Sequence, residues 1–278
     1  MEAKEIGPLR YSVFDPTGNI TALVESPVEP ERRRAIAASL MARLPEVEQV
    51  GFVRLGAPVS ANGPLRASLR MAGGEFCGNA SMSAAALCLL RSGRKKDAET
   101  VWLSVSGTDG PVEVRLERED AVSFRGAVRM PPARGISEID CSCGALAGKL
   151  PFVRMEGIGH LIVGADSPFF ALRNDGEAAG RAVRKLCAAL DTECLGLLFL
   201  TKEGAQYRMD PLVYVPLGNT LFWERSCASG SAAAAMYLAA KKGEAVSLEL
   251  SQPGGCLHAR SDPQRGETWL CGRTRLLT

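Results

Sequence analysis

The segments Cys77-Gly78-Asn79-Ala80-Ser81 and Cys227-Ala228-Ser229-Gly230-Ser231 share one pattern, and they lie in different halves of the chain. Each follows a short stretch that carries a glutamate, Glu75 or Glu224, and each opens an alanine-rich run that predicts a helix. Two thiols in equivalent places indicate a duplicated fold in which two cysteines face each other. Such a pair suits chemistry that acts on both faces of one carbon atom.

The bulk composition limits the classes of protein that need to be considered. The chain has 278 residues, of which 46% are hydrophobic and 23% are charged, and its formal net charge is +2. These values are close to those of globular proteins, and the length suits one large domain or two smaller ones. The small charge gives no electrostatic reason to bind nucleic acid or a membrane surface. No apolar run approaches the roughly 18 residues of a membrane span, so we expect neither partner.

The cysteine content bears on location and on metals. The nine cysteines are odd in number and irregularly spaced, and no secretory signal pattern precedes them. We therefore expect reduced thiols in a cytoplasmic protein. The pair Cys141 and Cys143 has no matching second pair, and the sequence holds only two histidines, so we expect no metal site.

Strand-like segments outnumber helical ones, which predicts a mixed α/β (α+β) fold. We predict helices at 31–44, 82–91, 175–190 and 232–240, and we expect the last of them to begin at 228, directly after its cysteine. The predicted strands cover 9–14, 20–25, 47–55, 100–106, 112–117, 122–130, 152–156, 160–164, 195–200, 206–209, 212–215, 246–250 and 267–276.

The segment Met130-Pro131-Pro132-Ala133-Arg134-Gly135 interrupts this pattern and predicts a hinge between two halves. We divide the chain into an N-terminal half, 1–131, and a C-terminal half, 132–265, with a final strand, 266–278, that returns to the N-terminal half. In each half a helix precedes several strands and a cysteine-headed helix. This repeated order supports duplication, and it puts the active site in the cleft between the halves.

The two cysteine-headed helices contain few charges before Arg91 and Lys241. A helix that is apolar on every side is a buried helix, and small side chains let the surrounding strands approach closely. We therefore expect two pseudo-symmetric halves, each a curved, mostly antiparallel sheet wrapped around one central helix. The N-terminus of each helix should lie at an open end of its sheet.

The start of a helix offers free backbone N–H groups and a partial positive charge, which together stabilise an anion. A thiol at such a helix start can have a lowered pKa, whereas a closed site would raise the energy of an unpaired thiolate. The amides of Gly78, Asn79, Ala228 and Ser229 are candidates to hold a substrate carboxylate. The residues alone leave two other interpretations open: the thiols are buried structural groups, and the Asn79 and Ser229 side chains only cap the helices.

Both cysteine segments resemble the signatures of a known enzyme family. Gly73-Gly74-Glu75-Phe76-Cys77-Gly78-Asn79 and Ser226-Cys227-Ala228-Ser229-Gly230-Ser231 are similar to the two motifs of diaminopimelate epimerase and related amino-acid racemases that do not use pyridoxal phosphate. Gly18-Asn19 resembles the family's substrate-contacting Gly-Asn pair, and Gly159-His160 resembles its mid-chain histidine motif.

This resemblance implies the diaminopimelate epimerase-like fold and a two-base mechanism without pyridoxal phosphate, metal or nucleotide. One cysteine thiolate removes the α-proton of a free amino acid, and the other cysteine delivers a proton to the opposite face. By carry-over, Cys227 acts on the L form and Cys77 on the D form. Asn19, His160 and Glu224 join the helix-start residues as candidate substrate-binding residues. The implied partner is a small-molecule amino acid; the oligomeric state stays open, with a homodimer as one option.

The chain departs from diaminopimelate epimerases where those enzymes hold the distal end of their substrate. Gly218 and Asn219 replace a Glu-Arg pair, Ile158 replaces an asparagine, and Arg70 or Met71 replaces another. An enzyme whose site has lost such polar groups should act on a different substrate rather than bind the same substrate slightly less tightly. We therefore predict racemisation of a different amino acid.

The compact form of the first motif and the run Trp223-Glu224-Arg225-Ser226-Cys227 look more like the histidine racemases of metallophore pathways. Histidine is thus the leading substrate. Glu75, Glu224 and Arg70 are candidates for contacts with or near the substrate, and the other interpretation of each is a solvated or helix-start charge.

Four alternatives remain. Diaminopimelate epimerase would need the missing Glu-Arg pair, and proline or hydroxyproline racemases resemble a Cys-Gly-His first motif rather than Cys77-Gly78-Asn79. An isomerase like those of phenazine biosynthesis uses a carboxylate and would not need both thiols. A non-catalytic protein on the same fold would bind amino acids without exchanging their α-proton.

Overall fold

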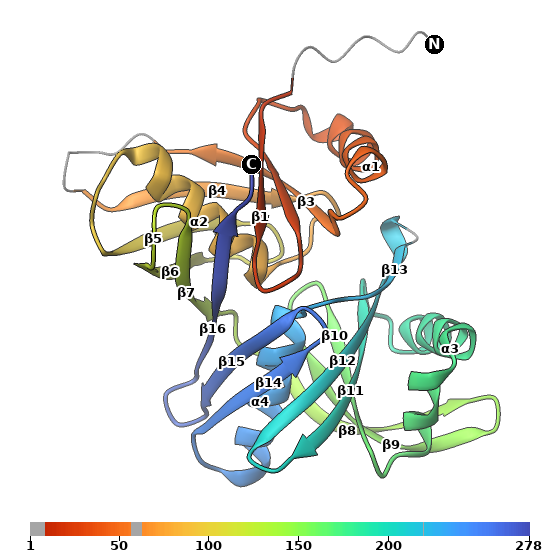
Figure 1. Cartoon of the computed structure of the whole chain (residues 1–278). Coiled ribbons are helices and arrows are strands. Elements are labelled where there is room, and N and C mark those ends of the chain that lie inside the picture. Colours follow the sequence, from red (N-terminus) through yellow and green to blue (C-terminus); the bar gives the residue numbers. More distant parts are fainter. Residues whose placement is uncertain (1–8, 57–62, 219) are drawn as a thin grey trace, which may run out of the picture.

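The computed structural model describes residues 9–56, 63–218 and 220–278, and their strands form one continuous sheet (Figure 1). The first half of the chain contains β1 (Tyr11–Asp15), β2 (Thr21–Val24), α1 (Arg33–Arg43), β3 (Gln49–Leu55), β4 (Leu65–Met71), α2 (Gly78–Ser92), β5 (Ala98–Val105), β6 (Pro111–Arg118) and β7 (Ser123–Met130). The second half contains β8 (Gly135–Cys143), β9 (Leu146–Arg154), β10 (Gly159–Gly164), α3 (Gly176–Ala189), β11 (Leu195–Glu203), β12 (Gln206–Val215), β13 (Thr220–Trp223), α4 (Ala228–Lys242), β14 (Val246–Gln252), β15 (Gly255–Asp262) and β16 (Glu267–Leu276). Short 3-10 helices lie at Pro30–Arg32, Pro168–Asn174 and Pro216–Gly218.

The first seven strands and β16 close into a barrel around α2. The strands follow one another in chain order from β1 to β7, β16 pairs with β7, and a further pairing of β1 with β16 closes the ring. The helix inside contacts strands on several sides of the barrel, including β4, β5, β7 and β16. The predicted fold class, mostly sheet with few helices, is confirmed.

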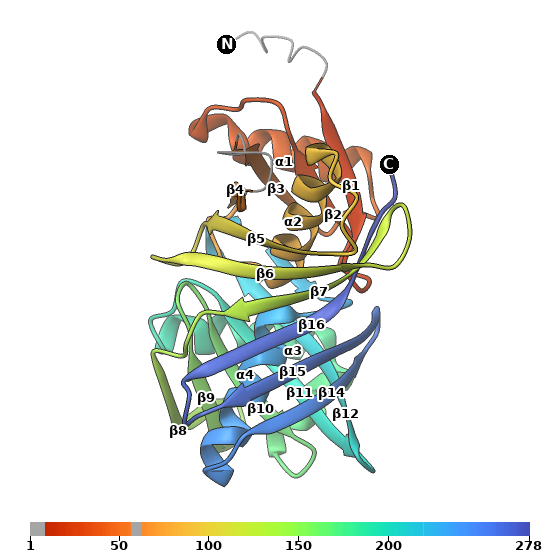
Figure 2. The same cartoon turned by 90° about the vertical axis from the view of Figure 1, so that its left-hand side faces the viewer.

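The remaining strands curve around α4 in the order β15-β14-β12-β11-β10-β9-β8. Helix α4 packs against β14, β15 and β16, while α3 covers β11 and β12 with a separate apolar cluster. Figure 2 shows β7 and β16 lying between the two halves. Strand β16 joins them because residues 267–271 pair with β15 while residues 268–275 pair with β7. The division at residue 131 stays our proposal, and these pairings agree with it.

The alanine-rich sequences of α2 and α4 produce the buried helices that we expected. From Gly78 to Leu89 every residue of α2 is buried, as is every residue of α4 from Ala228 to Met236. Both helices end at a glycine in the left-handed region, Gly93 and Gly243, where a side chain would be strained. The N-termini of the two helices meet: a Cβ added at Gly78 would lie 3.0 Å from the Cβ of Ala228.

Several strands were missed or divided by the sequence patterns. β4, β8, β13 and β15 were not predicted. β8 is mostly exposed, so its residues show no apolar alternation. The segments 206–209 and 212–215 form the single strand β12, because Pro211 sits within it without ending it. Helix α2 begins at Gly78, the residue after the cysteine and earlier than the alanine-rich run suggested, while α4 begins at residue 228 as predicted. Within the described ranges, no helix combines the length and apolar character needed to cross a membrane.

Candidate active site

The two cysteines are the N-caps of the two buried helices. The Cys77 Sγ accepts a hydrogen bond from the Ala80 N–H at 3.4 Å, and the Cys227 Sγ accepts one from the Gly230 N–H at 3.4 Å. In each case a serine hydroxyl, that of Ser81 or of Ser231, donates to the cysteine carbonyl at 2.7 Å. The repeated sequence pattern is thus a repeated local geometry.

Both thiols line one inner cavity of about 70 Å³ where the helix starts meet. Its walls include six of the residues that the sequence suggested for substrate binding, namely Asn19, Gly78, Asn79, Glu224, Ala228 and Ser229. In a helix the first N–H groups have no partner within the helix. Each Sγ binds only the third N–H group, and the N–H groups of Gly78, Asn79, Ala228 and Ser229 have no partner among the described residues, so they can bind a ligand.

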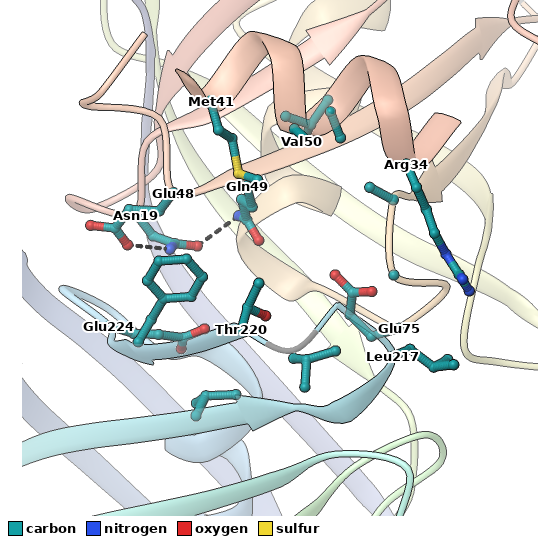
Figure 3. A pocket seen from close by; sticks show the side chains of 17 residues that line it. Asn19, Arg34, Met41, Glu48, Gln49, Val50, Glu75, Leu217, Thr220 and Glu224 are labelled. Carbon is teal, nitrogen blue, oxygen red and sulfur yellow. Dashed lines mark hydrogen bonds between the residues drawn. The ribbon is translucent and has the colours of Figure 1, made fainter. Parts of the chain in front are cut away.

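A larger outer cavity of about 380 Å³ adjoins the inner one and shares Asn19, Gln49, Glu75, Val213, Val215 and Glu224 with it. It lies between α1 and β3 on one side and β12 and β13 on the other (Figure 3). Three carboxyl groups line it, those of Glu48, Glu75 and Glu224. Cavities of this size are typical of small-molecule sites.

A network of side-chain amides within the N-terminal half reaches Cys77. The Cys77 thiol donates to Gln49 Oε1 at 3.1 Å, and Gln49 Nε2 donates to Asn19 Oδ1 at 2.6 Å. Asn19 in turn donates through Nδ2 to Glu48 Oε2 at 2.7 Å, and Asn79 Nδ2 donates to the Asn19 Oδ1 at 3.3 Å. Sequence reasoning missed Gln49, since a glutamine at the start of a strand carries no motif that connects it with a distant cysteine.

The partners of Cys227 are different. Burial and the nearby Glu224 carboxyl group both raise the pKa of its thiol, and its Sγ lies 3.7 Å from the Ser229 Oγ. Its backbone N–H donates to Gln252 Oε1 at 2.8 Å, and Gln252 Nε2 donates to the Ser231 Oγ at 3.0 Å. Gln252, at the end of β14, was also missed, because only the fold brings it to the start of α4.

Of the two opposing effects on the thiol pKa, burial in the closed site is the larger one. Burial raises the pKa of Cys77 to about 12, and burial together with the Glu224 carboxylate raises the pKa of Cys227 well above its ordinary value. The helix-start N–H groups act in the expected direction, but the loss of solvation outweighs them. Burial also raises the pKa of Glu224 to about 7, so this carboxyl group is poised to exchange a proton near neutrality.

His160 is not one of the described residues that line the inner cavity. It is buried in β10, and its Nε2 lies 3.0 Å from the Ser229 Oγ. Burial lowers the pKa of His160 to about 3, so the ring is neutral. Its contact with the site therefore passes through Ser229.

Some residues stand where diaminopimelate epimerases have the groups that bind the distal end of their substrate. These residues do not come together in one part of the structure. Ile158 lines the inner cavity, and Leu217, next to Gly218, lines the outer one. Asn219 lies outside the described residues. Arg70 is not among the described residues that line either cavity; its guanidinium donates to the Ser104 carbonyl at 2.8 Å on the outside of the barrel.

Three polar atoms in the wall of the inner cavity are buried without a partner among the described residues: Glu75 Oε2, Asn79 Oδ1 and Ser226 Oγ. Buried polar atoms normally have a hydrogen-bond partner. Their position beside both thiols makes them candidate contacts for the polar groups of a small substrate.

The fold and the opposed cysteines define a class, the cofactor-independent amino-acid racemases and epimerases. Among solved structures, a "predicted epimerase" of Pseudomonas aeruginosa has a TM-score of 0.65 at 17% identity, over 98% of each chain. A hydroxyproline epimerase of Agrobacterium vitis with bound trans-4-hydroxy-L-proline has a TM-score of 0.61 at 12% identity, over 97% of this chain and 91% of that one. At such identities the likeness concerns the fold.

The sequence comparisons give the family. The model of the histidine racemase CntK N-terminal domain matches residues 8–269, and the chain belongs to this family. A histidine racemase of Fusobacterium nucleatum is 28% identical over 256 residues, which are 90% of this chain and 88% of the relative. One of Staphylococcus aureus is 29% identical over 251 residues, 90% and 87% of the two chains. The chain is thus an isomerase of the amino-acid racemase class, and the resemblance found in the sequence is confirmed.

Proposed function

We propose that this racemase inverts the α-carbon of free histidine, with Cys77 and Cys227 as its two acid–base groups. The observation that carries the proposal is that both thiols line one small cavity, which adjoins a larger cavity with three carboxyl groups. The inner cavity would hold the α-carbon, and the outer cavity would hold the side chain.

The substrate carboxylate would bind the free N–H groups at the two helix starts. Both helices present the positive ends of their dipoles there, and the surrounding protein excludes water. The same groups would stabilise the negative charge that develops on the carboxylate when the α-proton leaves. Binding and stabilisation of the carbanion would therefore use one set of backbone atoms.

Proton transfer would begin at Cys227. Glu224 as a carboxylate accepts the thiol proton, and the thiolate then removes the α-proton of L-histidine. Cys77, whose thiol donates to the neutral Gln49 amide, delivers its own proton to the opposite face of the carbanion. The products are D-histidine, a Cys77 thiolate, a Cys227 thiol and a protonated Glu224, which keeps the proton it took from Cys227, and the reverse sequence converts D-histidine to L-histidine. The substrate ammonium group would offset part of the cost of a buried thiolate.

The lining of the outer cavity favours the imidazole ring of histidine over the distal amino and carboxylate groups of diaminopimelate. Glu48, Glu75 and Glu224 can accept hydrogen bonds from ring N–H groups, and Phe222 offers an aromatic face. Leu217 and Thr220 flank the place of the Glu-Arg pair of diaminopimelate epimerases. Arg34, exposed on α1, is the single cation among the described lining residues, and it would be the group to hold a distal carboxylate.

The test is proton exchange in D2O. Purified protein is incubated separately with L-histidine, L,L-diaminopimelate, L-proline and trans-4-hydroxy-L-proline, while NMR follows the α-proton and polarimetry follows the configuration. We expect loss of the α-proton of histidine together with inversion. Exchange of diaminopimelate alone would overturn histidine as the substrate, and binding without any exchange would overturn the racemase mechanism.

Location and assembly form part of the same proposal. All nine cysteines lie in the described ranges and are free thiols, which supports a reducing compartment such as the cytoplasm. For assembly we propose a homodimer, supported by the exposed apolar side chains of Leu217, Phe222 and Trp223. Fractionation of cells tests the first statement, and analytical ultracentrifugation tests the second.

A further inference from the structure

Glu249, Cys256 and His258 form a cluster on the β14–β15 hairpin. One ligand atom of each lies within 4.8 Å of those of the other two. Glu249 and His258 are directly opposite each other in the antiparallel register, and Cys256 lies on the same side of β15 as His258. The Cys256 thiol donates to Glu249 Oε1 at 3.6 Å. We call these three residues the hairpin cluster.

The hairpin cluster lies on the outer face of the sheet. Leu248 and Leu250 of β14 and Leu257 and Ala259 of β15 are buried in the core that contains α4. Because neighbouring residues of a strand point to opposite faces, the cluster faces away from α4 and the cysteine caps. His258 is exposed, while Glu249 and Cys256 are partly buried. The racemase chemistry proposed above does not use any of the three, so the cluster is independent of it.

The donor atoms select a class of metal ion. A thiolate, an imidazole nitrogen and a carboxylate oxygen are the ligands of zinc, whereas calcium and magnesium prefer oxygen alone. Bond lengths of about 2.0–2.3 Å to zinc put tetrahedral ligand atoms about 3.5 Å apart. The observed distances need only a small side-chain movement to reach this value. We propose that the hairpin cluster binds one zinc-class divalent cation through three protein ligands, with water at the fourth position.

The electrostatics of the hairpin cluster agree with a bound cation. The Cys256 thiol donates its proton to the Glu249 carboxylate, so the two groups that would ligate a cation already lie side by side. Arg260 follows His258 on the same face of β15 and lines a neighbouring hollow. Its positive charge limits the affinity of the site, and the Glu249 carboxylate and the Cys256 thiolate offset this repulsion.

The test is metal binding by the full chain in a Cys77→Ser/Cys227→Ser background, which removes the active-site thiols as competing ligands. Zn²⁺ is titrated by calorimetry, and Co²⁺ is titrated while the sulfur-to-metal absorption band is recorded. We expect one site per chain and a band that requires Cys256. Cys256→Ser and His258→Ala should each weaken binding at least about tenfold. Cys143→Ser, a partly buried thiol on β8, is the matched control and should leave binding unchanged.

A second measurement guards against variants that misfold. Zinc that binds only the folded chain raises its melting temperature by mass action, so it should stabilise the background protein and the Cys143→Ser control. It should not stabilise the two hairpin-cluster variants, whose own melting curves show whether they fold. The proposal is overturned if no zinc binds, or if Cys256→Ser and His258→Ala bind zinc as tightly as the control.

Discussion

The starts of α2 and α4 have the same backbone geometry but different side-chain partners. In both, a cysteine caps the helix through the N–H of the third helical residue, and a serine donates to the cysteine carbonyl. The Cys77 thiol, however, donates to an amide, Gln49, while the Cys227 thiol faces a carboxyl group, Glu224. An amide cannot take a proton and a carboxylate can. The two halves therefore use the same proton carrier, a cysteine, in the same backbone geometry. The neighbouring side chains prepare Cys77 as an acid and Cys227 as a base.

The largest expected effect comes from removing either thiol. Cys77→Ser and Cys227→Ser should each lower the racemisation rate in both directions by about 10²–10⁴, because each direction needs both proton carriers. The measurement is polarimetry of L- and D-histidine. Cys88→Ser, which changes a thiol further along α2, is the control and should keep activity. Near-full activity of either Cys77→Ser or Cys227→Ser would show that the two cysteines are not the two proton carriers.

The second-largest effect is expected from a substitution that separates the two helix starts. A side chain at Gly78 would meet the Ala228 Cβ at 3.0 Å and the Leu270 Cδ2 at 3.3 Å. Gly78→Val should therefore push the helix starts apart and lower kcat by about 10²-fold, since small displacements of reacting groups are costly. Ala228→Gly removes an atom from the same contact and should have a much smaller effect. Steady-state kinetics and circular dichroism distinguish lost geometry from unfolding.

Glu224 offers a way to sharpen the asymmetry. Because the carboxylate is the form that accepts the Cys227 proton, activity should rise with pH through the Glu224 pKa of about 7. Glu224→Gln should lower kcat by about 10²-fold and abolish this rise. Gln49→Met keeps the shape but loses the acceptor for Cys77, and it should cost about tenfold with the pH profile retained. A rise near pH 7 that persists in Glu224→Gln would assign it to another group.

The smallest effects concern stability against pH. The pKa of His160 falls from 6.5 to about 3 on folding, so its contribution is present above pH 6.5 and is lost as the pH falls toward 3. The pKa of Glu224 rises from 4.5 to about 7, so its contribution is present below pH 4.5 and is lost as the pH rises through 7. As the pH falls below 6.5, the melting temperature of His160→Gln should therefore decrease less than that of the unchanged protein. As the pH rises from 4.5 through 7, the melting temperature of Glu224→Gln should decrease less than that of the unchanged protein. Unchanged profiles would contradict these shifts.

The sequence allowed the buried helices and a thiol at the start of each to be predicted because both depend on local residues. It pointed to Asn79 and Ser229 as the capping side chains, whereas the cysteines themselves cap the helices. Alanine-rich runs predict burial, and a thiol before Gly-Asn or Ala-Ser predicts a helix start. Gln49 and Gln252 could not be found in this way, since only strand pairing brings them to the caps. Which of the two opposing effects on the thiol pKa is larger was also beyond local reasoning, because it depends on how much protein surrounds each sulfur.

Strand β16 gives the molecule a late folding step. Residues 268–275 pair with β7 and residues 275 and 276 pair with β1, while Val13 also exchanges hydrogen bonds with Leu277 and Thr278. The barrel around α2 therefore stays open on the ribosome until residues 267–278 have been made. Such distant pairing slows folding and leaves the edges of β1 and β7 exposed in the meantime. Trapping by chaperones during synthesis should accordingly depend on this one strand.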